Sequence, residues 1–148
     1  ESCLMKLQKI EIVHDFPQSV EQVFGWLSDH NNLSAIFAPF TVTRIKDGQT
    51  SVNGVGSVRK LSAFPLPPLE ETVTKFDANK LIEYTVTSKM APIKEHLGVM
   101  IFQPFNGGTR LHYTIVFKGV VPLLGPIVKV GLSQGVKRGL NKLATKIL

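Results

Sequence analysis

Residues 126–148 read PIVKVGLSQGVKRGLNKLATKIL, and this stretch decides the fold. Apolar side chains recur along it at helical spacing, and polar side chains occupy the opposite side. Pro126 is a suitable start, because proline is tolerated in the first turn of a helix. The stretch therefore predicts one long amphipathic helix. Its apolar face comprises Val128, Leu132, Val136, Leu140, Leu143 and Ile147, and its polar face Gln134, Lys137, Arg138, Asn141, Lys142 and Thr145.

Glycine recurs at every fourth position of this helix, as Gly131, Gly135 and Gly139. Each glycine costs about 1 kcal/mol relative to alanine in a helix interior. The stripe crosses the edge of the apolar face, so the helix lacks side-chain volume where it meets the rest of the protein. Either another stretch of backbone comes very close there, or another group fills the space.

Upstream of the helix, the sequence predicts strands joined by short turns. Alternating apolar residues predict the first strand, which ends at Pro17. Ser19 and Gln22 have the spacing of a capping box and start a short helix. The expected helices cover residues 19–28 and 33–37, and the expected strands cover residues 7–16, 41–46, 54–63, 70–77, 81–88, 95–105 and 109–118.

This order of elements predicts the fold class. Strands with tight connections form an antiparallel meander, and a long helix with one apolar face must pack against it. We therefore expect an α+β fold in which a curved antiparallel sheet of seven strands surrounds the C-terminal helix. Two short helices follow the first strand, and residues 1–148 form a single domain.

Composition narrows the classes of partner. Seventeen Lys and Arg against eleven Asp and Glu give a net charge of +6. These charges are scattered, and aromatic residues are not interleaved with them as single-stranded nucleic acid would require. A solvated surface is thus favoured over a nucleic-acid site. The best basic cluster is on the polar side of the last helix, at Lys129, Lys137, Arg138, Lys142 and Lys146.

The termini and the single cysteine suggest a compartment. Cys3 is the single cysteine, so an internal disulfide and a cysteine-rich metal site are excluded. One cysteine is typical of a reducing, cytoplasmic environment. No apolar run approaches the roughly 18 residues of a membrane span, and the N-terminus lacks a signal-peptide pattern. Met5 is a candidate native start, which would make the residues before it foreign to the chain.

Motifs for several kinds of chemistry are missing from the sequence. It contains no His-Glu-x-x-His metal motif, no glycine-rich phosphate loop and no Gly-x-Ser-x-Gly nucleophile motif. We therefore expect no metal and no cofactor, and hydrolase, kinase and dehydrogenase activities are disfavoured.

Three short motifs give the chain a family resemblance: PQSVEQVF at 17–24, GVGSVR at 54–59 and GGTRL at 107–111. With the order of elements, they resemble the helix-grip fold of the START and birch-pollen-allergen (SRPBCC) superfamily, specifically its polyketide cyclase/dehydrase-like branch with lipid-transport relatives. The resemblance implies an apolar cavity between the concave sheet and the last helix, which holds a hydrophobic or aromatic small molecule. The loop FPLPPL at 64–69 corresponds to the gate loop of plant hormone receptors with this fold.

Alternation and this resemblance together predict which side chains face the cavity. In the strand 95–105 both faces are apolar, and the resemblance favours the face of His96. The other face, with Leu97, Val99 and Ile101, is then an exposed partner surface, or the register is wrong. The predicted cavity residues are Arg59, Leu61, Phe64, Leu66, Leu69, Glu71, Val73, Ile82, Tyr84, Val86, His96, Gly98, Met100, Leu111, Tyr113, Ile115, Phe117, Leu132, Gly135, Val136, Gly139 and Leu140.

Five of these residues are polar: Arg59, Glu71, Tyr84, His96 and Tyr113. A buried carboxylate beside a histidine suits acid–base chemistry, because burial shifts pKa values toward neutrality. Glu71 and His96 are therefore the catalytic candidates. The alternative is that these groups hydrogen-bond one another or orient a carbonyl or hydroxyl of a ligand.

The other histidines are assigned no chemistry. His14 lies on an apolar strand face and is interpreted as a structural residue with satisfied hydrogen bonds. His30 and His112 are interpreted as surface residues.

Three functions follow from these observations. The leading hypothesis is a carrier or binding protein for a hydrophobic, lipid- or polyketide-like small molecule. The second is a cyclase or dehydratase that uses Glu71 and His96. The third is a protein that contacts a membrane surface or an acidic partner through the basic side of the last helix. A homodimer is compatible with each of them.

Overall fold

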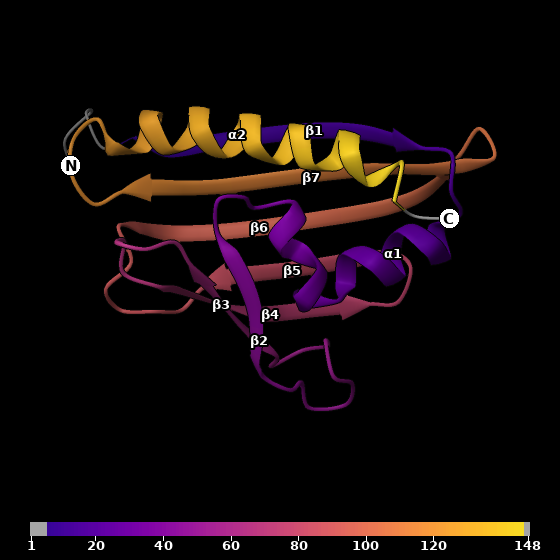
Figure 1. Cartoon of the computed structure of the whole chain (residues 1–148), viewed down its shortest axis with the longest axis horizontal. Coiled ribbons are helices and arrows are strands. Elements are labelled where there is room, and N and C mark those ends of the chain that lie inside the picture. The colour runs from indigo at the N-terminus through magenta and orange to yellow at the C-terminus, as the bar shows by residue number, and fades with distance from the viewer. Residues whose placement is uncertain (1–5, 147–148) are drawn as a thin grey trace.

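The computed structural model describes residues 6–146 (Figure 1). Cys3, Met5 and Ile147 lie outside these residues, so the interpretations that concern them stay predictions. The elements are β1 (Gln8–Phe16), α1 (Val20–Ser28), η2 (His30–Ala35), β2 (Thr41–Lys46), β3 (Val58–Ser62), β4 (Leu69–Asp77), β5 (Leu81–Val86), β6 (Ile93–Phe105), β7 (Gly108–Gly119) and α2 (Leu124–Leu143).

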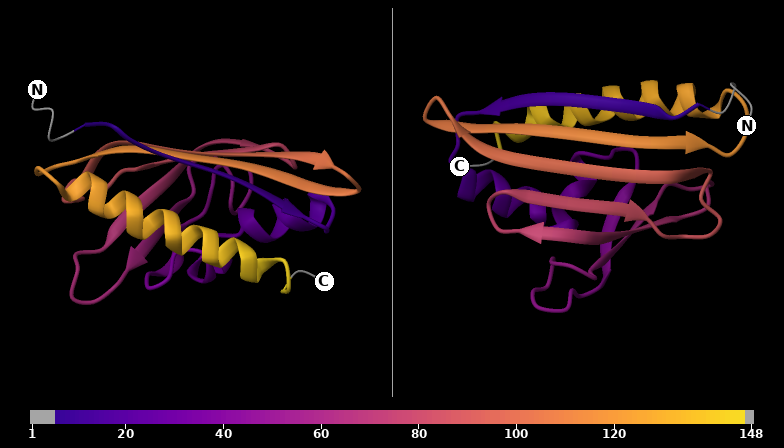
Figure 2. Two further views of the ribbon diagram at one scale, coloured as in Figure 1. Left: turned by 90° about the horizontal axis from the view of Figure 1, so that it is seen from above. Right: turned by 180° about the vertical axis from the view of Figure 1, so that it is seen from behind.

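The strands form one antiparallel sheet in the order β1-β7-β6-β5-β4-β3-β2. Consecutive strands from β2 to β7 pair directly, and β1 joins the far edge by pairing with β7. The helices α1, η2 and α2 all lie on one side of the sheet, which curves around them (Figures 1 and 2). The predicted α+β helix-grip fold is confirmed.

The concave face of the sheet forms the core, as the alternation predicts. In β7 the side chains of Leu111, Tyr113, Ile115 and Phe117 are buried. In β6 the face that carries His96 is the buried one, so the predicted inward face of that strand is confirmed. The opposite, convex face exposes the apolar side chains of Leu97 and Ile101, flanking the partly buried Val99. The use of that strip as a partner surface stays a prediction, as does the homodimer.

The long helix α2 begins two residues before its predicted start, and Leu123 before it adopts a left-handed conformation with φ of 71°. Its second half buries the expected apolar side chains of Val136, Leu140 and Leu143. Its first half covers less of the sheet, and Ile127 and Val130 are exposed there. The helix therefore packs against the core mainly through its C-terminal turns.

The three glycines of α2 have different surroundings. A Cβ added to Gly139 would lie 2.8 Å from Cα of Ile36, so helix and backbone are in direct contact at this position. A Cβ on Gly135 would meet only a backbone oxygen at 3.5 Å, and a Cβ on Gly131 would meet nothing within 4 Å. Close backbone approach therefore explains Gly139, and it does not explain the other two.

The short elements differ from prediction mainly at their boundaries. Ser19 and Gln22 form the expected capping box at the start of α1. The second short helix is a 3₁₀ helix that starts at His30, earlier than expected, because the Asp29 carboxylate accepts a hydrogen bond from the Asn31 amide. The strand β3 is shorter than expected, because turns occupy the glycine-rich segment before Val58. No helix between residues 6 and 146 combines the length and apolarity needed to cross a bilayer.

Candidate functional site

A cluster of polar side chains is buried between η2 and the concave face of the sheet. Arg59 of β3 is only 3% exposed, and Glu71 of β4 only 6%. His96 of β6 and the tyrosines Tyr84 and Tyr113 are buried beside them. All five polar residues predicted from the sequence therefore lie in the interior, on five adjacent strands.

An ion pair lies at the centre of this cluster. Arg59 and Glu71 are directly opposite in the β3–β4 ladder, and Nε of Arg59 donates a hydrogen bond to Oε1 of Glu71 at 2.8 Å. Burial by itself lowers the pKa of Arg59, but the adjacent Glu71 carboxylate, together with Tyr84 and Tyr113, more than offsets burial, and the pKa is raised. The guanidinium therefore stays charged in the interior, where a charge is tolerated only with such a partner.

His30 of η2 lies in the interior and contacts Arg59, so its interpretation as a surface residue is wrong. Its Nδ1 accepts a hydrogen bond from Nη1 of Arg59 at 3.1 Å, because an arginine can only donate. Its Nε2 then carries the proton and donates to Oγ of Ser57 at 2.7 Å. Burial, with the positive charges of Arg59 and Arg44, lowers the pKa of His30 to about 3.

The depressed pKa of His30 predicts that the protein loses stability in acid. Below the usual histidine value of 6.5, the unfolded chain binds a proton that the folded protein rejects until the pH approaches about 3. The free energy of unfolding is therefore expected to fall with pH across this window, by up to about 1.4 kcal/mol per pH unit for this one group. Urea denaturation at a series of pH values measures the slope.

His30→Gln is the variant for this measurement, since glutamine has both a donor and an acceptor but does not titrate. Its slope is expected to be shallower than that of the wild-type protein between pH 6 and 4. The half-buried His112, which pairs with Glu11 on the convex face, gives the matched control His112→Gln. Equal slopes for His30→Gln and the wild-type protein would contradict the prediction.

His96 is held as a hydrogen-bond donor rather than as a base. A bulge in β6 lies between Lys94 and Leu97, where Glu95 has a φ of 52°. Nδ1 of His96 accepts from the Val86 amide at 3.1 Å, so Nε2 carries the remaining proton. Burial lowers the pKa of His96, although Glu71 opposes this, and the imidazole is neutral. Nε2 lies 3.9 Å from Oε2 of Glu71, too far for a hydrogen bond.

The two tyrosines lie side by side on the other flank of the arginine. The hydroxyl groups of Tyr84 and Tyr113 are hydrogen-bonded to each other. Burial raises the pKa of both phenols, so both keep their protons. Gly98 makes room for this arrangement, because a Cβ there would lie 2.2 Å from Cζ of Tyr84.

One nitrogen of the Arg59 guanidinium donates no hydrogen bond. Its Cζ lies 4.3 Å from the ring centre of Tyr84 and 5.9 Å from that of Phe37, so aromatic rings accompany the cation. Within residues 6–146, its buried Nη2 has no hydrogen-bond partner. An unsatisfied buried donor of this kind is rare and requires an explanation.

The remaining residues of the predicted cavity vary in exposure. Phe64 is fully exposed and Leu66 is 57% exposed, both in the proline-rich loop between β3 and β4. Leu69, Val86, Leu132 and Gly135 are partly buried. That these residues line a ligand cavity stays a prediction. The same holds for the buried members of the predicted cavity, which are Leu61, Val73, Ile82, Gly98, Met100, Leu111, Ile115, Phe117, Val136, Gly139 and Leu140.

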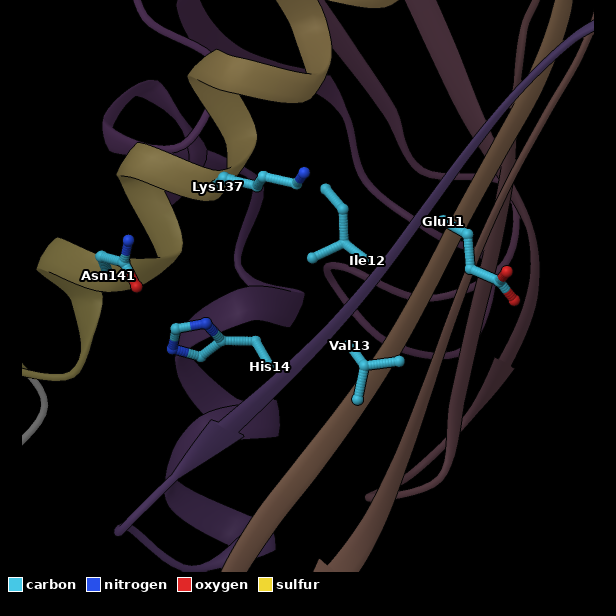
Figure 3. A pocket seen from close by; sticks show the side chains of 6 residues that line it. All are labelled: Glu11, Ile12, Val13, His14, Lys137 and Asn141. Carbon is cyan, nitrogen blue, oxygen red and sulfur yellow. The ribbon is translucent and has the colours of Figure 1, made fainter.

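Two open hollows lie outside this interior. One, of about 400 Å³, is a groove between β1 and α2. Figure 3 shows Ile12 and His14 projecting from β1 toward Lys137 and Asn141 of the helix, while Glu11 and Val13 point away. The other, of about 540 Å³, lies beside the start of α1 and the β4–β5 and β6–β7 turns. Neither is lined by a residue of the predicted cavity.

His14 in this groove has a ring contact rather than a polar partner. Its ring centre lies 4.5 Å from that of Phe16, and burial lowers its pKa. No hydrogen bond to its imidazole is found among the described residues, so the prediction of satisfied hydrogen bonds stays a prediction, while the packing role fits. Across residues 6–146, His, Cys, Asp and Glu side chains nowhere gather in threes as a metal ion would require.

The sequence matches the model of a protein family described as polyketide cyclase/dehydrase and lipid transport, over residues 8–147. The chain belongs to this family. The predicted membership of the SRPBCC superfamily is thereby confirmed. No protein with a curated function matches this member of the family significantly.

Solved structures resemble this member of the polyketide cyclase/dehydrase and lipid transport family over most of its length. Protein TTHA0849 from Thermus thermophilus superposes with a TM-score of 0.73 at 14% identity, covering 95% of this chain and 97% of that one. Ara h 8.0201 gives 0.69 at 14% identity, with 95% and 99% covered. The Aha1 dimer from Colwellia psychrerythraea gives 0.67 at 14% identity, with 95% and 96% covered. Identities this low establish the shared fold alone.

His30, Ser57 and Phe37 are the site residues that sequence reasoning missed. The sequence predicts Phe37 only as the end of a short helix, and Ser57 only as part of a family motif. One signal for His30 was available: it follows the capping residue Asp29 and precedes Leu33 at one-turn spacing, so both can face the core. Nothing in the local pattern distinguishes Ser57 from a turn residue.

Proposed function

We propose that this protein binds a hydrophobic or aromatic small molecule, lipid- or polyketide-like, on the concave face of the sheet and acts as a carrier or binding protein. The site comprises the cluster around Arg59 and the apolar side chains that surround it beneath η2 and α2. Membership of a family whose description includes polyketide cyclases and lipid transport supports this class of ligand.

The observation that carries the proposal is the ion pair of Arg59 and Glu71, which is buried beside the apolar core. A buried ion pair is a weak source of stability, and apolar residues of similar volume commonly do as well or better. A core that had only to be stable would not need this pair. Placed among apolar side chains, it supplies the few convergent polar groups that orient a ligand in a mostly apolar site.

The alternative is a cyclase or dehydratase with Glu71 and His96 as an acid–base pair. Both side chains are inward and near each other, which such an enzyme requires. The lone pair of Nδ1 that would make His96 a base is already used by the Val86 amide. Glu71 in turn is paired with Arg59. Binding is therefore the better-supported function.

A direct test is native mass spectrometry of the protein purified from its own host, combined with a thermal-shift screen of hydrophobic compounds. We expect a bound small molecule or a compound that raises Tm, because a ligand that binds only the folded state stabilises it. A protein that carries no added mass and responds to no compound would contradict the proposal.

The proline-rich loop between β3 and β4 provides a second prediction. Phe64 is fully exposed, so Phe64→Ser removes no core packing and is expected to change the free energy of unfolding by at most about 0.5 kcal/mol. If the loop acts as a gate, the same change raises the dissociation rate of a bound hydrophobic ligand. Stopped-flow displacement measures that rate. Ile101→Ser, at an exposed apolar position on the convex face, is the matched control.

The third hypothesis concerns the basic side of α2. Lys129, Lys137, Arg138, Lys142 and Lys146 are all exposed, as contact with a membrane surface or an acidic partner requires. Sedimentation with anionic liposomes at low and high salt tests it, since electrostatic binding of this kind weakens as salt screens it.

A further inference from the structure

The strand β1 has an open outer side. It is last in the order of the sheet and pairs only with β7 (Figure 1). Every second residue of an antiparallel strand directs its N–H and C=O groups away from its partner strand. Outside the ladder with β7, the part of the chain that the structure describes forms no hydrogen bond to the backbone of residues 9–15. The outer side of β1 therefore offers N–H and C=O groups to a further strand.

The groove between β1 and α2 runs along this strand. Residues 11–14 line it in succession, a length of about 13 Å at about 3.3 Å per residue. The side chains of Glu11 and Val13 point away from the groove, so these two residues line it with their backbone (Figure 3). An extended segment of about four residues would therefore lie beside the backbone of β1.

The groove contains a cation and no acidic side chain. Lys137 points into it from α2, and no ion pair of this lysine is found within residues 6–146. Glu11 lies on the convex face of the sheet, where its carboxylate is 3.0 Å from Nε2 of His112. Ile12 and His14 complete the β1 side of the groove. A carboxylate in the groove would thus meet Lys137 without an acidic side chain to repel it.

We propose that the groove between β1 and α2 is a docking site for an extended acidic peptide segment, which adds to the sheet beside β1 and places a carboxylate against Lys137. In this mode of recognition the main-chain hydrogen bonds give affinity, and alternate side chains give specificity. The groove shares no lining residue with the cluster around Arg59. The inference is therefore independent of the proposed function and goes beyond it.

A second copy of the chain fits this edge less well. Two copies paired through β1 about a two-fold axis would form one continuous sheet, with both α2 helices on the same side of it. Lys137 of each copy would then face the shared groove, and like charges repel. A peptide with the opposite charge is attracted instead.

Two pentapeptides with blocked ends test the choice of charge: acetyl-Thr-Val-Glu-Val-Thr-amide and the same peptide with Lys in place of Glu. Titration of the isotope-labelled protein, followed by NMR, measures each dissociation constant and maps the contact. We expect the acidic peptide to bind at least about 10-fold more tightly, because its charge is opposite to that of Lys137. The amide signals of residues 9–15 are expected to shift. Equal binding of the two peptides would overturn the proposal.

Two further peptides test the pairing of backbones. Each is the acidic peptide with N-methyl groups on alternate residues, on both Val in one and on Glu and both Thr in the other. Only one alternate set of N–H groups faces a neighbouring strand, and N-methylation removes the donor. We expect one methylated peptide to lose affinity by about 10-fold or more and the other to bind like the parent. Loss or retention of binding by both would overturn strand addition.

A matched pair of variants tests the position of the charge. Lys137 and Lys142 are both exposed on α2, and of these two only Lys137 lines the groove. In Lys137→Gln the preference for the acidic peptide over the lysine peptide is expected to fall below about threefold. In Lys142→Gln it is expected to stay as in the wild-type protein. Equal losses in the two variants would mean that the general charge of the helix attracts the peptide, and would overturn the site.

The other possible occupants of the groove give distinct results. Acetate that binds as tightly as the acidic peptide would overturn the proposal in favour of a small carboxylate. Signals of residues 9–15 that shift with protein concentration, without peptide, would show that a second copy covers the edge and would also overturn it. Each of these results leaves the proposed function intact, because neither concerns the interior site.

Discussion

Glu71→Ala is expected to lower the free energy of unfolding by about 3–5 kcal/mol, the cost of leaving a buried charge without its partner. Arg59 is buried, and Nε of this residue donates to Oε1 of Glu71 at 2.8 Å. Once the carboxylate is gone, the guanidinium keeps only its bond to His30, a neutral acceptor. Urea denaturation monitored by circular dichroism measures the change as a shift of the midpoint at constant m-value.

The control is the double variant Arg59→Met/Glu71→Leu, which removes both charges and keeps similar volumes. It is expected to be as stable as the wild-type protein or more stable, because replacing a buried ion pair with apolar side chains also removes its desolvation cost. A double variant as unstable as Glu71→Ala would mean that the pair itself stabilises the fold. That result would remove the main support for a ligand-orienting role.

These two variants separate stability from function at the same position. If the double variant keeps the fold and loses binding of a hydrophobic small molecule, Arg59 and Glu71 serve binding rather than folding. The ion pair would then be a cost in stability that the surrounding apolar core offsets. Marginal stability makes such a cost measurable, because a few kcal/mol is a large fraction of the total for a domain of this size.

The faces of the strands could be predicted from the sequence because strand side chains alternate strictly. Alternation places Tyr84, Tyr113 and Glu71 inward, and all three are buried. For His96, where both faces of the strand are apolar, the alternation is ambiguous and only the family resemblance decides. The sequence thus identifies which residues form the polar cluster, but it does not show how they contact one another.

The connections inside the cluster were not predictable in the same way. The contact of Arg59 with His30 joins the 3₁₀ helix η2 to β3, and the whole of β2 lies between these two elements in the chain. A 3₁₀ helix of six residues is too short for its buried face to appear as a periodic pattern. The pairing of Arg59 with Glu71 depends on the register across a long proline-rich loop, whose geometry no turn motif specifies. Long-range contacts of this kind come from packing, which local patterns do not encode.

The glycines of α2 illustrate a further limit, and they give the second large prediction. Gly139→Ala is expected to lower the free energy of unfolding by about 1–3 kcal/mol, the usual cost of overpacking. The added Cβ would lie 2.8 Å from Cα of Ile36 and 2.9 Å from the carbonyl oxygen of Ala35. These are backbone atoms, so the helix or the segment after η2 must move. Thermal unfolding measures the loss as a lower Tm.

The other two glycines are matched controls on the same helix. Gly131→Ala meets nothing within 4 Å, and Gly135→Ala meets one oxygen at an ordinary distance of 3.5 Å, so neither change is obstructed. Each is expected to raise stability by about 1 kcal/mol, the difference in helix propensity between glycine and alanine. The same substitution should therefore change sign between Gly135 and Gly139, one turn apart. Stabilisation by all three would mean that α2 does not touch the Ile36 backbone, and that the space beside Gly139 is open to a ligand instead.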